Sequence, residues 1–143
     1  MAALLFSCGN MLAMAGWLAL LVALFVTRAR PSVILVTRFV IPAVLGAAYI
    51  ALLVVGADAF KEGGFSSIAQ VRALFANDNA LTAGWLHYLA FDLFVGTWIV
   101  EDGTRRGVNP LLTVPCLILT FLFGPAGYLL YNLARLTRAQ HTD

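Results

Sequence analysis

The sequence predicts an all-α integral membrane protein with four transmembrane helices, and three observations support this prediction. Hydrophobic residues make up 62% of the 143 positions and charged residues only 11%, whereas soluble domains contain about 45–50% and about 25% of these classes. Four apolar runs each come close to the ~20 residues that a bilayer core requires. Short polar segments separate the first run from the second and the third from the fourth. At 15.4 kDa, the chain is expected to form a single membrane domain.

The four predicted spans follow from the apolar runs and their polar boundaries. They cover residues 3–26, 33–55, 80–100 and 111–133. The connections Thr27–Ser32 and Glu101–Pro110 make a hairpin of each adjacent pair. No basic residue precedes the first run, and the run continues past the A-x-A pattern Ala13–Ala15, so we expect a retained span and not a signal peptide. No segment rich in Arg and Ser precedes it, which favours a bacterial cytoplasmic membrane over a plastid membrane.

The longer central connection, Gly56–Asn79, is predicted to contain a short amphipathic helix over residues 66–77. Gly63-Gly64 interrupts the chain, and Ser66 or Ser67 can cap the start of a helix. Four apolar side chains then recur at helical spacing on one face: Ile68, Val71, Leu74 and Phe75. Such a helix would lie in the membrane interface, and an ordinary linker turn is the alternative.

The charged residues exclude some functions and leave the orientation open. A net charge of +2 without a run of four basic residues predicts neither nucleic-acid binding nor a polybasic lipid-binding segment. With four straight spans, one side carries Lys61, Arg72, Arg135 and Arg138, and the other carries Arg28, Arg30, Arg38, Arg105 and Arg106. Four against five gives no bias under the positive-inside rule.

An internal similarity suggests that the two hairpins are related. At an offset of 68 positions, residues 15–56 share ten identities with residues 83–124. Two hairpin repeats would be parallel, related by an axis along the membrane normal. The positions equivalent to His87 and Asp92 are Ala19 and Leu24. Because these polar residues break the symmetry, they are the better candidates for function.

Asp92 lies near the centre of the third run, with His87 five residues before it. A carboxylate at that depth costs about 2.5–3.5 kcal/mol, so it needs a partner, a water-filled cavity or a function. The two side chains are about 140° apart around a helix, so they either line one cavity from adjacent sides or contact different helices. The structural alternatives are an ion pair of Asp92 with Arg38, or a hydrogen bond to a free carbonyl, and an interhelical hydrogen bond for His87.

Two further features could belong to a site. Arg38 lies four residues before Pro42 and either snorkels to the interface or turns inward toward Asp92 or a ligand. Pro115 and Gly124–Gly127 are predicted to kink the fourth span and to open space for a ligand. The predicted cavity for a flat, conjugated, lipid-soluble molecule is lined by Trp85, Tyr88, Phe91, Phe121, Gly124 and Pro125. Core packing is the alternative role for these residues.

Several chemistries lack their motifs. The chain contains no glycine-rich phosphate loop, no H-E-x-x-H, no G-x-S-x-G and no multi-histidine box. Cys8 and Cys116 lack metal-ligand spacing. We therefore expect no metal and no cofactor, so that any reaction would be redox-neutral.

Three strings are distinctive: Gly63–Ser67 followed by Val71–Phe75, then Gly84–Gly96, and then Pro115–Leu117 with Leu119–Gly127. Together they resemble the abscisic-acid-deficient-4-like family of small four-span membrane proteins, which occur in plastids and bacteria. The plant members are linked to the formation of neoxanthin from violaxanthin, so the resemblance implies a role in xanthophyll metabolism. A basic residue often follows the Val-Gly of this family, where this chain has Thr97.

The resemblance implies a carotenoid-like or other isoprenoid ligand and a redox-neutral isomerase reaction. Opening an epoxide to a hydroxylated allene needs an acid at the oxygen and a base at a neighbouring carbon. Asp92, kept protonated by its apolar surroundings, is the candidate acid, and His87 is the candidate base. The alternative is a non-catalytic carotenoid-binding or assembly subunit. The expected partners are the lipid bilayer and either a second copy or a larger pigment or enzyme complex.

Overall fold

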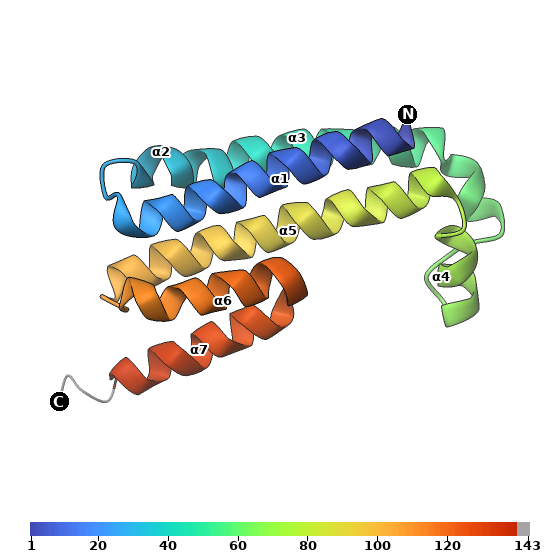
Figure 1. The fold of residues 1–143 in the computed structure, drawn as a ribbon. Helices are drawn as coiled ribbons and strands as arrows, with labels where there is room; N and C mark the ends of the chain where they lie inside the picture. The colour runs from blue at the N-terminus through green and yellow to red at the C-terminus, as the bar shows by residue number, and fades with distance from the viewer. Residues whose placement is uncertain (140–143) are drawn as a thin grey trace.

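The computed structural model describes residues 1–139, with side chains as far as Leu136, and the elements over this range are helices (Figure 1). Within the described residues, three helices are long and apolar enough to cross a membrane. They are α1 (Ala2–Phe25), the helix Arg30–Val55, and α5 (Asp78–Arg105). The predicted all-α class is confirmed. The second and third predicted spans lie within these helices, and the first extends one residue beyond the end of α1.

The second long helix contains a π-helical turn before its proline. It consists of α2 (Arg30–Leu35), the π-turn η1 (Val36–Val40) and α3 (Ile41–Val55). Pro42 has no N–H to donate and its ring crowds the preceding turn, which accounts for the local widening of the helix. The Arg30 guanidinium donates hydrogen bonds to the carbonyl oxygens of Ala23 (3.0 Å) and Leu24 (3.3 Å), and so satisfies free acceptors at the end of α1.

The predicted amphipathic helix is present but shorter than expected. After the 3₁₀ helix η2 (Ala57–Lys61), α4 covers Ile68–Leu74. Ser67 caps it, because its hydroxyl accepts a hydrogen bond from the backbone N–H of Gln70 at 3.2 Å. Leu74 is buried against the protein, whereas the side chain of Ile68 is largely exposed. The exposed apolar surface at the start of α4 suits the interface position that the sequence suggested.

The predicted fourth span, 111–133, is wrong, because the chain reverses at Gly124 (Figure 1). α6 covers Pro110–Phe123, a length of about 21 Å, and α7 covers Pro125–Ala139. The Tyr88 hydroxyl donates to the Leu122 carbonyl near the end of α6, so α6 is antiparallel to α5. Gly124, just before α7, lies against Asp92, and the Tyr131 hydroxyl donates to Asp102 ten residues later in α5, so α7 runs parallel to α5. The second half of the predicted span therefore returns beside the first.

Three residues account for this reversal. Gly124 has a φ of +41°, a conformation that side chains rarely adopt. Pro125 cannot donate a helical N–H and begins a new helix. Gly127 is buried where α7 meets the backbone of Cys116 and Thr120 in α6. The sequence predicted a break at this point, but the break is a turn and not a kink.

The structure does not divide the chain into two equivalent hairpins. At an offset of 68, the turn at Val26–Ala29 corresponds to residues 94–97, which lie in the middle of α5. The match is better at the far ends, since Gly56 follows α3 and Gly124 follows α6. The internal similarity therefore does not describe the turns of the fold.

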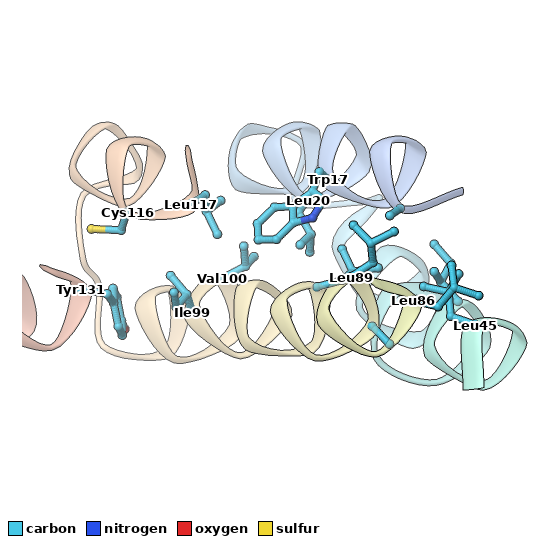
Figure 2. Packing of buried hydrophobic residues seen from close by; sticks show 14 of the residues in the cluster. Trp17, Leu20, Leu45, Leu86, Leu89, Ile99, Val100, Cys116, Leu117 and Tyr131 are labelled. Carbon is cyan, nitrogen blue, oxygen red and sulfur yellow. The ribbon is translucent and has the colours of Figure 1, made fainter. Parts of the chain in front are cut away.

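The core lies along α5, which packs against α1, α3 and α6 (Figures 1 and 2). Leu86 and Leu89 pack in its first half, and Ile99 and Val100 in its second half (Figure 2). Gly96 allows close contact with the indole ring of Trp17, which also meets the edge of Phe121 at 5.6 Å between ring centroids. Because α5 is central, side chains on its different faces contact different helices.

The reversal of α7 gathers seven of the nine basic residues at one end of the helices. These are Arg28, Arg30, Arg38, Arg105, Arg106, Arg135 and Arg138, and the opposite end holds Lys61 and Arg72. Cytoplasmic segments of membrane proteins carry such an excess. We therefore expect the arginine-rich end to face the cytoplasm. The sequence alone left this orientation open, because four straight spans would divide the basic residues almost equally between the two sides.

Cysteine labelling in intact bacteria that express the protein tests this orientation. In a background without Cys8 and Cys116, a membrane-impermeant maleimide is expected to label Ser66→Cys. Thr27→Cys is expected to react only after the membrane is opened. Both positions are exposed in turns between helices. Labelling of Thr27→Cys from outside the cell would reverse the assignment.

Candidate functional site

An apolar groove runs along the contact between α3 and α5. It consists of two adjoining cavities of about 320 Å³ and about 410 Å³, and both are bordered by Tyr49 and His87. The first cavity extends from this pair toward Pro42 and Phe94. The second extends toward Phe60, which lies in η2, and Phe65, which lies just before α4. We call this feature the α3–α5 groove.

Tyr49 and His87 are the only residues with polar side chains among those that line the α3–α5 groove. The His87 ring stacks on Phe91 at 4.5 Å between centroids and lies 5.9 Å from the Tyr49 ring. His87 is exposed, so its imidazole is accessible to a molecule in the groove. The groove thus offers one hydroxyl and one imidazole within an otherwise apolar and largely aromatic surface.

Small residues explain why two packed helices leave this space. Gly46 of α3 faces open space, with no heavy atom within 4 Å of the position that a Cβ would take. Ala80, Gly84 and Ala90 contribute little volume from the α5 side. Larger residues at these positions would fill the groove, so the groove exists because these side chains are small.

Asp92 lies on another face of α5, beside the turn between α6 and α7. The cavity there, of about 260 Å³, is lined by Asp92, Val95, Gly124, Pro125 and Tyr128. A Cβ at Gly124 would lie 2.7 Å from the Asp92 Oδ1 atom. The Oδ2 atom is buried and has no hydrogen-bond partner among the described residues. Glycine at the turn therefore leaves room for the carboxyl group.

The structure separates the predicted acid from the predicted base. His87 borders the α3–α5 groove and Asp92 borders the cavity at the α6–α7 turn, and the two cavities share no lining residue. Of the two arrangements that the helical spacing allowed, the chain adopts the one in which the side chains meet different helices. A single ligand in the groove would contact His87 without Asp92.

The predicted pairing of Arg38 with Asp92 is wrong. Arg38 forms an ion pair with Glu101 in the last turns of α5. The reason is depth, since Arg38 lies in η1 near the start of its helix and therefore reaches the end of the antiparallel α5. Asp92 lies more than two turns farther into α5. Arg38 thus has a structural partner. It lines neither the two cavities of the α3–α5 groove nor the cavity beside Asp92.

The six predicted cavity residues are likewise divided among several places. Phe91 lines the α3–α5 groove, and Gly124 and Pro125 line the Asp92 cavity. Phe121 packs against Trp17. The Trp85 ring contacts the rings of Phe6 and Tyr88 in tilted arrangements, at 5.9 Å and 5.4 Å between centroids. Its indole N–H donates to the Asn10 side-chain oxygen at 3.1 Å.

Sequence reasoning missed Tyr49 and the residues around Asp102. Tyr49 corresponds to Leu117 at the offset of 68, so the asymmetry that singled out His87 could also have identified it. Asp102 was assigned to a polar connection, but α5 continues through it and the side chain is only 1% exposed. No local pattern indicated that it would be covered by α7.

The long apolar helices and the apolar groove between two of them are compatible with the class of multi-pass membrane proteins. A family model narrows this class: the model described as ABA DEFICIENT 4-like matches residues 4–131. The chain therefore belongs to the ABA DEFICIENT 4-like family, as its motifs suggested. No curated protein and no solved structure matches it. The family suggests a role linked to carotenoid and neoxanthin metabolism.

Proposed function

We propose that this protein binds a long, lipid-soluble isoprenoid of the carotenoid type in the α3–α5 groove and isomerises it without a cofactor. The observation that supports this proposal is the position of Tyr49 and His87 at the junction of two apolar cavities. Ligand sites commonly combine an apolar lining with a few polar groups that orient the ligand. The membership of the chain in its family supports a carotenoid as the ligand.

The dimensions and lining of the groove suit a polyene. On α5 its lining runs from Ala80 to Phe94, which corresponds to about 21 Å of helix. Aromatic rings occur along this length at Phe75, Phe91 and Phe94. Their faces can stack on a conjugated chain and stabilise positive charge that develops on it. With the polyene chain in one of the two cavities, a polar end ring at their junction would contact Tyr49 and His87.

The proposed reaction uses these two side chains in place of the Asp92–His87 pair. The Tyr49 hydroxyl gives its proton to an epoxide oxygen as the C–O bond breaks, and the His87 imidazole removes a proton from a neighbouring carbon. A hydroxyl group and a new C=C bond result, without net oxidation or reduction. The imidazolium then returns a proton to the tyrosine, and the two rings are close, at 5.9 Å between centroids.

The test is the pigment profile of a host that makes epoxy-carotenoids, with membrane levels of each variant measured. His87→Ala is expected to lower product formation at least about 100-fold, the usual contribution of a general base. Tyr49→Phe removes one hydroxyl group and is expected to have a similar effect. Val44→Ala, on an exposed position of α3 outside the groove, is the control. Loss of product in Asp92→Asn but not in His87→Ala would reject the groove as the site.

A non-catalytic binding or assembly function is the second candidate. The absence of a carboxylate among the lining residues of the groove favours it, since the lining then holds few groups for proton transfer. In that case, an unaltered carotenoid should copurify with the protein. Gly46→Leu, which fills open space in the groove, should abolish copurification while the pigment composition of the host stays constant.

A further inference from the structure

One buried carboxylate at the arginine-rich end holds three arginines. The Asp102 Oδ1 atom accepts a hydrogen bond from Arg105 at 2.7 Å, and Oδ2 accepts from Arg106 at 2.8 Å and from Arg135 at 3.3 Å. The Tyr131 hydroxyl also donates to Oδ2, at 2.9 Å. We call these five residues the Asp102 cluster. It joins α5 to α7.

The Asp102 cluster carries more positive charge than its structural role requires. Three guanidinium groups surround one carboxylate, so the cluster has a net charge of +2. The neighbouring acid, Glu101, is already paired with Arg38. The Arg105 and Arg106 side chains are 70% and 53% exposed. Each guanidinium has five N–H donors, and Arg105 and Arg106 each use one of them on Asp102, so most of their donors do not contact this carboxylate.

The position of the cluster indicates what supplies the missing negative charge. α5 has 28 residues, about 42 Å, and exceeds the ~30 Å hydrocarbon core. Its last turn therefore lies at the depth of the lipid headgroups. Trp98, one turn below the cluster, stacks under Arg135 at 5.4 Å and has the amphipathic character of a residue at the interface. Guanidinium groups match phosphate oxygens in charge and in geometry.

We propose that the Asp102 cluster binds the phosphate group of an anionic phospholipid. Asp102 holds Arg105 and Arg106 side by side, so that their free N–H groups can bind phosphate oxygens together. The bound lipid would neutralise the excess charge where α5 and α7 meet. This site is separate from the α3–α5 groove, and lipid binding does not depend on whether the groove is catalytic.

Native mass spectrometry of the purified protein with phosphatidylglycerol or phosphatidylcholine tests the proposal. Wild-type protein is expected to retain phosphatidylglycerol preferentially. Because each basic residue near an anionic lipid contributes about fivefold to binding, R105Q should lower this preference about fivefold and R105Q/R106Q about 25-fold. K61Q/R72Q removes the same charge at the opposite end and should change nothing.

Two results would overturn the proposal. One is equal retention of phosphatidylglycerol by R105Q/R106Q and K61Q/R72Q. The other is displacement of phosphatidylglycerol by millimolar inorganic phosphate, which would identify the ligand as free phosphate. If the double variant fails to fold, R105Q decides alone, because the Arg105 side chain is mostly exposed and Arg106, Arg135 and Tyr131 still hold Asp102.

Discussion

Asp102→Asn is expected to lower the free energy of unfolding by about 3 kcal/mol, because it leaves several charges without a partner. The carboxyl group is 1% exposed and receives bonds from three arginines and Tyr131. An amide keeps the shape but has no charge, and its NH₂ group cannot accept hydrogen bonds. Two of the arginines are well exposed, so solvent screening keeps the loss at the lower end of the range for buried pairs.

Equilibrium unfolding in mixed detergent micelles measures this difference. Asp58→Asn is the matched control, because it makes the same chemical change in an exposed ion pair with Lys61 at 2.5 Å. It should change stability by less than about 1 kcal/mol. If Asp102→Asn unfolds like Asp58→Asn, then packing holds α7 against α5 and the ion pairs contribute little.

Gly127→Ala is expected to open the hairpin between α6 and α7. A methyl group at this position would collide with the backbone of Cys116 and Thr120. Backbone atoms cannot rotate away as a flexible side chain can, so the helices must separate. Overpacking of this kind costs about 1–3 kcal/mol, and here we expect the upper part of that range.

Cys116 reports on this opening, because its thiol is buried in the wild-type protein. In a Cys8→Ala background, Gly127→Ala should make Cys116 react with a small, membrane-permeant thiol reagent at least several times faster. Gly46→Ala is the control, since it makes the same change at a helical glycine that faces open space. That substitution should preserve stability or raise it by up to about 1 kcal/mol. Equal thiol reactivity in both variants would contradict the close packing of α7 on α6.

Local features of the fold could be predicted because they depend on neighbouring residues. Apolar runs identified α1, the helix from Arg30 to Val55, and α5. Ser66 and Ser67 were the two candidate caps for α4, and Ser67 is the residue that caps it. The sequence also located the break at Gly124. It could not give the direction of the chain after that break, because the direction depends on contacts of α7 with α5 and α6.

The candidate site shows the same division. The unusual residues His87 and Asp92 were recognisable as polar groups in an apolar helix. Their spacing was compatible with one shared cavity or with two, and the packing of α3 and of the α6–α7 turn decided for two. Tyr49 joins His87 only because α3 lies antiparallel beside α5 (Figure 1).

The sequence by itself determined the class of protein, its family and most of its helices, since composition, periodicity and motifs are properties of the chain alone. Only the tertiary structure decided that Arg38 pairs with Glu101, that Asp102 is buried among arginines, and that the basic residues gather at one end. Each of these outcomes depends on how deep a residue lies along its helix and on which helix lies beside it. For α7, the reversal at Gly124 sets both the depth of each residue and the helices beside it. No local sequence pattern specifies either of these.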